Sequence, residues 1–149
     1  MTLAREYFEG IRSERVKISK TEEMLERMAE REAAKAQSYE IGRGSGGTTV
    51  SDAIDRRIDM EGRLKKRAAN LQKDIDEALV VLYGQDNRGG LAKLKGNRYA
   101  DAICMYYLQA ESWEDIADVM QSSKRWCQQL CCAGFVFIDK LGWAKCENA

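Results

Sequence analysis

Side chains that could contact nucleic acid cluster within eight positions of the chain. They are Ser122, Ser123, Lys124, Arg125, Trp126, Gln128 and Gln129, with Cys132 further along. Arginine suits the edge of guanine, and glutamine can pair with N6 and N7 of adenine. Serine hydroxyls and free N–H groups at a helix start can bind phosphate. These residue types therefore predict contacts with duplex DNA. The alternative is an exposed face of an ordinary three-helix bundle, with Trp126 at a protein interface.

Enzymatic chemistry has little basis in this sequence. There is no histidine, so the commonest general base and the commonest metal ligand are missing. Cys127, Cys131 and Cys132 lie close together, but they form neither the C-x-x-C pairs nor the Cys/His sets of structural zinc sites. We interpret Cys104, Cys127 and Cys131 as small core residues. We therefore expect no enzyme, no metal and no cofactor.

A second group of basic residues lies in the middle of the chain, on a predicted helix. It comprises Arg63, Lys65, Lys66 and Arg67. These side chains could contact phosphate or an acidic partner. A run of charge at helical spacing is also typical of a solvated helix face, so both interpretations stay open.

Two short helices must position the residues near 122–129. Ser112 is a suitable N-cap for a first helix through Met120, in which Trp113, Ile116, Ala117 and Met120 share one face. Gln121-Ser122-Ser123 interrupts this pattern, and Ser123 can cap a second helix that extends to about Asp139. The inward residues of that helix are predicted to be Cys127, Leu130, Cys131, Gly134, Phe135 and Ile138. This arrangement is a helix-turn-helix, whose second helix enters the major groove of DNA.

The motif S-W-E-D-I-A-D-V-M-x-x-S-x-R, with Leu130 and Ile138 after it, resembles a family of small phage and prophage proteins. These ArpU-type proteins are similar to region four of bacterial sigma factors, and the resemblance covers residues 100–138. It implies a DNA-binding transcriptional regulator that contacts promoter DNA, RNA polymerase or both. Where the family usually has glycine, a valine-like residue and further basic residues, this chain has Gln121, Cys127 and an uncharged stretch at 128–132.

The remaining chain is predicted to be helical. It has 149 residues, 44% hydrophobic and 32% charged, and no proline. Residues 2–39 carry an apolar row at Ala4, Ile11, Ile18 and Leu25, with Tyr7, Thr21 and Met28 beside it. Residues 51–83 carry a second stripe, comprising Ile54, Ile58, Leu64, Ala68, Leu71, Ile75, Leu79 and Leu82, and Thr49 or Ser51 could cap this helix.

Both stripes are buried at once if the two helices form an antiparallel, coiled-coil-like hairpin over residues 1–83, with a flexible loop at 41–50. The thin seam favours either packing between neighbouring helices or self-association. Residues 84–96 are rich in glycine and predict a hinge, with a short helical turn near Leu91–Leu94. Residues 97–141 then form the tri-helical helix-turn-helix domain, and 142–149 a tail whose Trp143 packs back onto the core. The predicted core comprises Ile103, Leu108, Trp113, Ile116, Met120, Leu130, Phe135 and Ile138.

The 24 basic and 24 acidic residues balance, which counts against tight DNA binding by a monomer but not by a dimer. No apolar run is long enough for a membrane span and no signal-peptide pattern is present, so we expect a protein of the host bacterial cytoplasm with reduced thiols. The leading hypothesis is a sigma-like transcriptional regulator that forms a homo-oligomer. Two alternatives stay open: a small terminase-like subunit for phage DNA packaging, and an inhibitor of a host enzyme that does not bind DNA.

Overall fold

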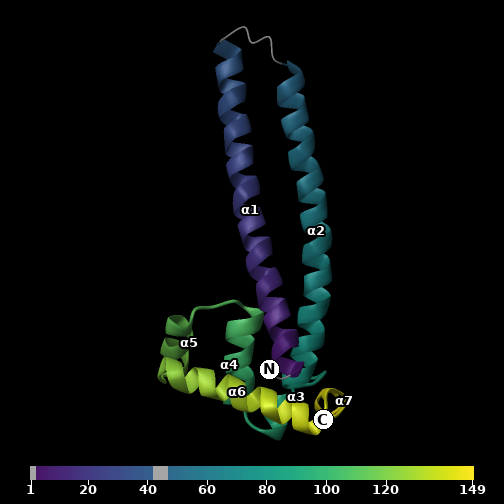
Figure 1. Cartoon of the computed structure of the whole chain (residues 1–149), viewed down its shortest axis with the longest axis vertical. Coiled ribbons are helices and arrows are strands. Elements are labelled where there is room, and N and C mark those ends of the chain that lie inside the picture. Colours follow the sequence, from purple (N-terminus) through teal and green to yellow (C-terminus); the bar gives the residue numbers. More distant parts are fainter. Residues whose placement is uncertain (1–2, 42–46) are drawn as a thin grey trace. The chain divides into compact units, whose positions relative to one another are not determined.

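A computed structural model describes residues 3–41 and 47–149, with side chains for 3–37 and 51–149. The elements are α1 (Leu3–Ile41), α2 (Gly47–Tyr83), α3 (Gly90–Leu94), α4 (Asn97–Ile103), the π-helix η1 (Cys104–Leu108), α5 (Trp113–Met120), α6 (Lys124–Leu141) and α7 (Trp143–Glu147) (Figure 1). No strand occurs in the described ranges, so the predicted all-α class is confirmed. None of these helices combines the length and apolar character needed to cross a membrane.

The chain divides into two compact units, and the long helices contribute to both. Unit 1 comprises Met1–Val16 and Leu71–Ala149, and unit 2 comprises Lys17–Asn70. We expected a hairpin at 1–83 and a separate helix-turn-helix domain at 97–141. Contacts instead assign the first sixteen residues and the end of α2 to the unit that contains the helix-turn-helix. Unit 1 is therefore built from two pieces of chain that are distant in the sequence.

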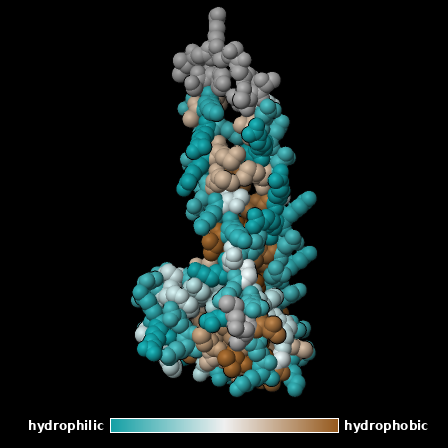
Figure 2. Space-filling view, in the orientation of Figure 1, coloured by the Kyte–Doolittle hydropathy of each residue, from teal (hydrophilic) through white to brown (hydrophobic). Residues whose placement is uncertain are grey.

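Unit 2 consists of two helical segments that lie side by side and run antiparallel (Figure 1). Ile18 and Leu25 of α1 are buried, and Arg57 of α2 pairs with Glu32 of α1 at 2.7 Å. Figure 2 shows hydrophobic side chains between the two long helices, bordered by hydrophilic ones. The predicted α1 row is confirmed here, and it continues into unit 1 with buried Ala4 and Ile11.

The predicted apolar stripe of α2 is wrong at Ile58, which is 53% exposed. Successive helical residues are rotated by about 100°, and this places Ile58 well away from the face that contains Leu71 and Ile75. The preceding residue, Arg57, lies on the inward side instead. It pairs with Glu61 at 2.7 Å in addition to Glu32. A polar ion-pair network therefore interrupts the seam where we expected an aliphatic side chain.

The start of α2 also differs from the prediction. The helix begins at Gly47, so Thr49 and Ser51 lie within it and neither is its N-cap. Serine and threonine cost little in a helix, so nothing in their chemistry stops it from extending past them. Of the predicted loop 41–50, Ile41 belongs to α1 and residues 47–50 to α2, and 42–46 lie outside the described residues.

The core of unit 1 is an aromatic cluster that joins its two pieces of chain. Phe8 of α1 is completely buried, with ring centroids 5.4 Å from Phe135 and 6.2 Å from both Tyr107 and Trp143. Tyr7 lies 4.7 Å from Trp143 in an edge-on arrangement. The expectation that Trp143 packs onto the core is confirmed, whereas the central role of Phe8 was not predicted.

Residues 84–96 and 142–149 are both folded into unit 1. After a turn, α3 buries Leu91 completely, and it contacts α4 and α7. Gly90 has φ +66°, and a Cβ there would lie 2.6 Å from the carbonyl oxygen of Val81, so this turn requires glycine. The segment expected to act as a hinge thus packs closely, and the segment expected to be a tail forms α7 with Cys146 buried.

Candidate nucleic-acid interface

Helix α5 has the start and the apolar face that its sequence predicts. The hydroxyl oxygen of Ser112 accepts a hydrogen bond from the Asp115 N–H at 3.2 Å, which is an N-cap. Ile116 is fully buried, and Trp113, Ala117 and Met120 are partly buried beside it. The helix ends at Gln121, which adopts a left-handed conformation with φ +51°.

Helix α6 presents its two faces as predicted. The hydroxyl oxygen of Ser123 accepts a hydrogen bond from the Trp126 N–H at 3.1 Å and so caps the helix. All six predicted inward residues are buried: Cys127, Leu130, Cys131, Gly134, Phe135 and Ile138. The opposite face is exposed and contains Lys124, Arg125, Trp126, Gln128, Gln129 and Cys132. We call the exposed residues 124–129 together with Ser122 and Ser123 the α6 face.

Aromatic stacking fixes α5 to η1, and a cation–π contact connects the same tyrosine to α1. The Trp113 ring stacks on Tyr106 with centroids 3.8 Å apart and planes inclined by 14°. The guanidinium carbon of Arg12 lies 3.8 Å from the centroid of the same tyrosine ring, and its Nη1 donates to the Tyr106 carbonyl at 2.6 Å. Residue 12 of α1 therefore helps to position the helix that supports α6.

The structure adds a basic residue to the α6 face that the sequence pattern did not indicate. Arg98, near the start of α4, donates from Nη2 to the hydroxyl oxygen of Ser122 at 2.6 Å. Arg5 of α1 similarly donates from Nη2 to the Cys132 sulfur at 3.3 Å. Both arginines are distant in sequence from residues 122–132, so spacing within the helix-turn-helix could not reveal them.

One predicted DNA contact is already engaged within the protein. The Lys124 ammonium lies 2.7 Å from Glu114 Oε1, across the turn between α5 and α6. The hydrogen bond from Lys124 lowers the pKa of the Glu114 carboxyl below its ordinary value. If Lys124 binds DNA, it must therefore exchange this carboxylate for a phosphate. The neighbouring Arg125 is exposed and is the next cation of α6.

The second basic group belongs to unit 2. Arg63, Lys65, Lys66 and Arg67 are all exposed on α2, as a solvated helix face would be.

The cysteines divide into buried and accessible groups. Cys127 and Cys131 are in the core, as predicted, whereas Cys104 is only partly buried. Burial raises the pKa of the Cys131 thiol to about 12. Over residues 3–41 and 47–149, no three side chains of the metal-binding types are grouped so that they could hold an ion.

The fold and the α6 face define an all-α protein with a helix-turn-helix in which both helices begin with a serine N-cap. No family model, no curated protein and no solved structure matches the chain.

Proposed function

We propose that the protein is a phage-type transcriptional regulator that binds duplex DNA through the α6 face. The supporting observation is the division of α6 into a continuous buried face and an exposed face that carries Arg125, Gln128 and Gln129. Both helices of the motif begin with a serine N-cap, and N–H groups at the start of a helix can bind phosphate. The similarity of this segment to region four of sigma factors supports promoter DNA or RNA polymerase as the partner.

A homo-oligomer would compensate for the small number of cations on one α6 face. Two copies double the phosphate contacts and read two half-sites. Unit 2 supplies the surface for self-association, because Met24 is 44% exposed and Ile58 is 53% exposed there. Burial of these side chains against a second copy would remove apolar surface from water.

The test is binding to random-sequence duplex DNA by fluorescence anisotropy at about 50 and 200 mM salt, with the mass of the complex from light scattering. We expect a dimer whose affinity falls steeply with salt. The combined variant Lys124→Ala, Arg125→Ala, Gln129→Ala should abolish most of this binding. A control with the same loss of charge, Lys17→Ala, Lys20→Ala, Gln37→Ala in α1, should retain it.

Absence of binding at the lower salt concentration would refute the DNA-binding proposal. Equal losses in the two variants would show that the contact is not specific to the α6 face. A ring-sized mass that binds DNA would favour the terminase-like packaging subunit instead of a regulator.

A second candidate is a protein-binding inhibitor that does not bind DNA. Trp126, which is 45% exposed at the start of α6, favours this function, since tryptophan is enriched at protein interfaces. Only one unpaired cation, Arg125, accompanies it in the first turn of that helix. The DNA titration described above distinguishes the two functions, because an inhibitor of this kind would not bind DNA at either salt concentration.

A further inference from the structure

We propose that a groove between α4–η1 and α5 binds a short segment of a partner protein that combines an apolar side chain with a lysine or arginine. The groove has a volume of about 580 Å³, and no residue of α6 lines it. None of residues 122–129 lines it, and Arg98, which donates to Ser122, is the lining residue that connects the groove to the α6 face.

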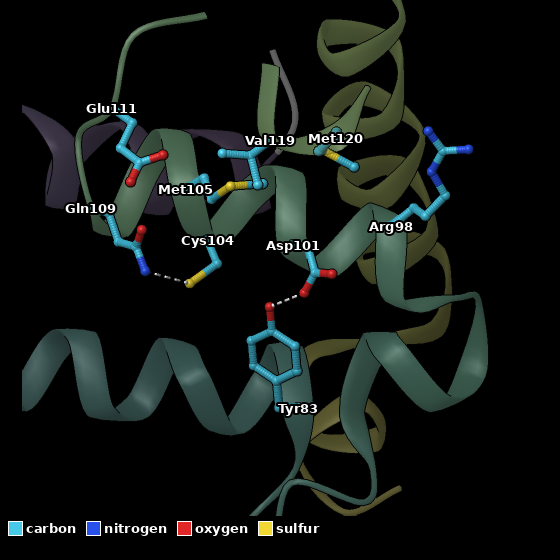
Figure 3. Close-up of a pocket in the computed structure, with 9 residues that line it drawn as sticks. All are labelled: Tyr83, Arg98, Asp101, Cys104, Met105, Gln109, Glu111, Val119 and Met120. Atoms are coloured by element: carbon cyan, nitrogen blue, oxygen red, sulfur yellow. Dashed lines mark hydrogen bonds between the residues drawn. The ribbon is translucent and has the colours of Figure 1, made fainter. Parts of the chain in front are cut away.

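The middle of the groove is apolar and exposed. Met105 of η1 faces Val119 of α5 (Figure 3), and Met120 of α5 also lines the groove. Val119 is 68% exposed, which is unusual for a valine on a well-packed helix. Methionine side chains adapt their shape to a ligand, and they are common at protein-binding surfaces. These three residues form a site for an aliphatic or thioether side chain of a partner.

Carboxylates flank this apolar patch. Glu111 lies at one end of the groove and Asp101 lies beside Tyr83 (Figure 3), and neither carboxylate forms an ion pair among the described residues. Asp101 Oδ1 accepts a hydrogen bond from the Tyr83 hydroxyl at 2.6 Å, which leaves its charge uncompensated. The one cationic lining residue, Arg98, directs its guanidinium away from Asp101 and donates to Ser122.

The negative potential acts on the floor of the groove. The pKa of the Cys104 thiol is raised above its ordinary value, first by burial and then by the charges of Asp101 and Glu111. The thiol therefore stays neutral, and a cationic group in the groove would be attracted by the two carboxylates. Complementary charge therefore selects a basic partner segment over an acidic one.

The backbone around the groove is irregular. In η1 the Gln109 N–H bonds to the Cys104 carbonyl at 3.0 Å, one residue further back than in an α-helix. Ala110, which follows, has φ +55°. A π-helical turn and a left-handed alanine are each unfavourable, and both are frequent at functional sites. Cys104 and Met105 of η1 line the groove, and Ala110 lies between the lining residues Gln109 and Glu111, which supports a binding role for the groove.

The experiment uses the full-length chain with ¹³C-methyl methionine and follows NMR signals during a peptide titration. Two designed helical peptides serve as probes: one with alternating rows of leucine and lysine, and one in which glutamate replaces every lysine. We expect saturable shifts of the Met105 and Met120 methyls with the lysine peptide only. Met24, Met28 and Met60 lie outside the groove and act as internal controls.

Two variants and two matched controls test the residues. Glu111→Gln should weaken binding about two- to fivefold, as expected for an exposed ion pair. Val119→Lys should abolish it, because it replaces the apolar contact by a repelling charge. Asp118→Asn and Val136→Lys make the same chemical changes at exposed sites outside the groove and should leave the affinity unchanged.

Three outcomes would overturn the proposal. They are an absence of saturable shifts, equal shifts with the glutamate peptide, and equal affinities for the groove variants and their controls. If spermine alone produced the same shifts of the Met105 and Met120 methyls, the groove would be a site for small cations and not for a protein segment.

Discussion

At the scale of single residues, Gln121 is one of the positions where side-chain type and backbone conformation conflict. Its φ of +51° lies in the left-handed region, which costs L-residues other than glycine roughly 1–2 kcal/mol. The turn is nevertheless well formed, since the Ser122 N–H bonds to the Ala117 carbonyl at 3.1 Å. We predict that Gln121→Gly raises the free energy of unfolding by about 0.5–1 kcal/mol.

Chemical denaturation measures this change. The control is Gln128→Gly, the same replacement within α6, which should lower the free energy of unfolding by about 1 kcal/mol. A destabilised Gln121→Gly variant would mean that the glutamine side chain contributes more than the backbone strain costs.

The five thiols should differ sharply in reactivity. Cys132 is exposed, whereas Cys127, Cys131 and Cys146 are buried. A pKa of about 12 leaves Cys131 almost completely protonated at pH 8, and only the thiolate is nucleophilic. We predict that Ellman's reagent modifies Cys132 first in the native protein at pH 8.

The Cys132→Ser variant should lose this fast phase, and urea should expose the remaining thiols. Folding raises the pKa of the Cys131 thiol. The buried neutral thiol therefore makes its full contribution to the free energy of unfolding below about pH 8.5, and this contribution is lost as the pH rises towards 12. A fast phase that persists in Cys132→Ser would place an accessible thiol elsewhere.

At the scale of the elements, the ion pair between Glu114 of α5 and Lys124 of α6 would compete with phosphate in the proposed DNA complex. We predict that Glu114→Gln raises DNA affinity about two- to fivefold at low salt, since Lys124 is then available. Anisotropy titrations with the same random duplex measure the change. The control Asp118→Asn removes an exposed carboxylate of the same helix, so it measures how far the loss of one negative charge by itself changes the DNA affinity. If both variants gained equally, the ion pair would have no specific role.

The elements that the sequence predicts best are α5 and α6, because Ser112 and Ser123 are strong local start signals. The apolar residues that follow have an uninterrupted helical period. The π-helical end of the segment after Asn97 was not predictable, since Cys104–Leu108 is compatible with an ordinary α-helix. The error at Ile58 arises from the same limit: periodicity shows that a stripe exists, but a neighbouring ion pair decides which residue faces inward.

At the scale of the whole molecule, unit 1 depends on a phenylalanine from the beginning of the chain. Phe8 is enclosed by Tyr107, Phe135 and Trp143. We predict that Phe8→Ala lowers the free energy of unfolding by about 3–5 kcal/mol, through lost burial and the cavity that remains. Thermal and urea unfolding followed by circular dichroism measure this change. Leu3→Ala, at a highly exposed position of the same helix, should change it by less than about 0.5 kcal/mol.

Unit 2 should be dispensable for the fold of unit 1. Within unit 1, the Tyr7 hydroxyl donates to the Asp74 carbonyl at 3.2 Å, so the two helical segments are adjacent there. We predict that replacement of Lys17–Asn70 by a Gly/Ser linker of about ten residues gives a cooperatively folded monomer. Circular dichroism and light scattering test this. Loss of cooperativity would show that unit 1 needs unit 2, and an unchanged oligomer would place self-association in unit 1.

These long-range features were not predictable from the sequence for a common reason. Helical period assigned Ala4 and Ile11 correctly to an inward face, but it does not say which distant residues cover that face. The contacts of Phe8 with Phe135, and of Arg98 with Ser122, are set by tertiary packing alone. The candidate site was therefore predictable within residues 112–132 and not beyond them.

The composition of unit 1 from two distant pieces constrains how the nascent chain folds on the ribosome. Phe8 leaves the exit tunnel well before its partners Phe135 and Trp143, which follow it in the chain by 127 and 135 residues. At about 5–20 residues per second, this aromatic side chain waits on the order of ten seconds without its native contacts. The helix-turn-helix therefore cannot reach its final packing before Trp143 has been translated, and a chaperone that protects the emerging α1 would act in that interval.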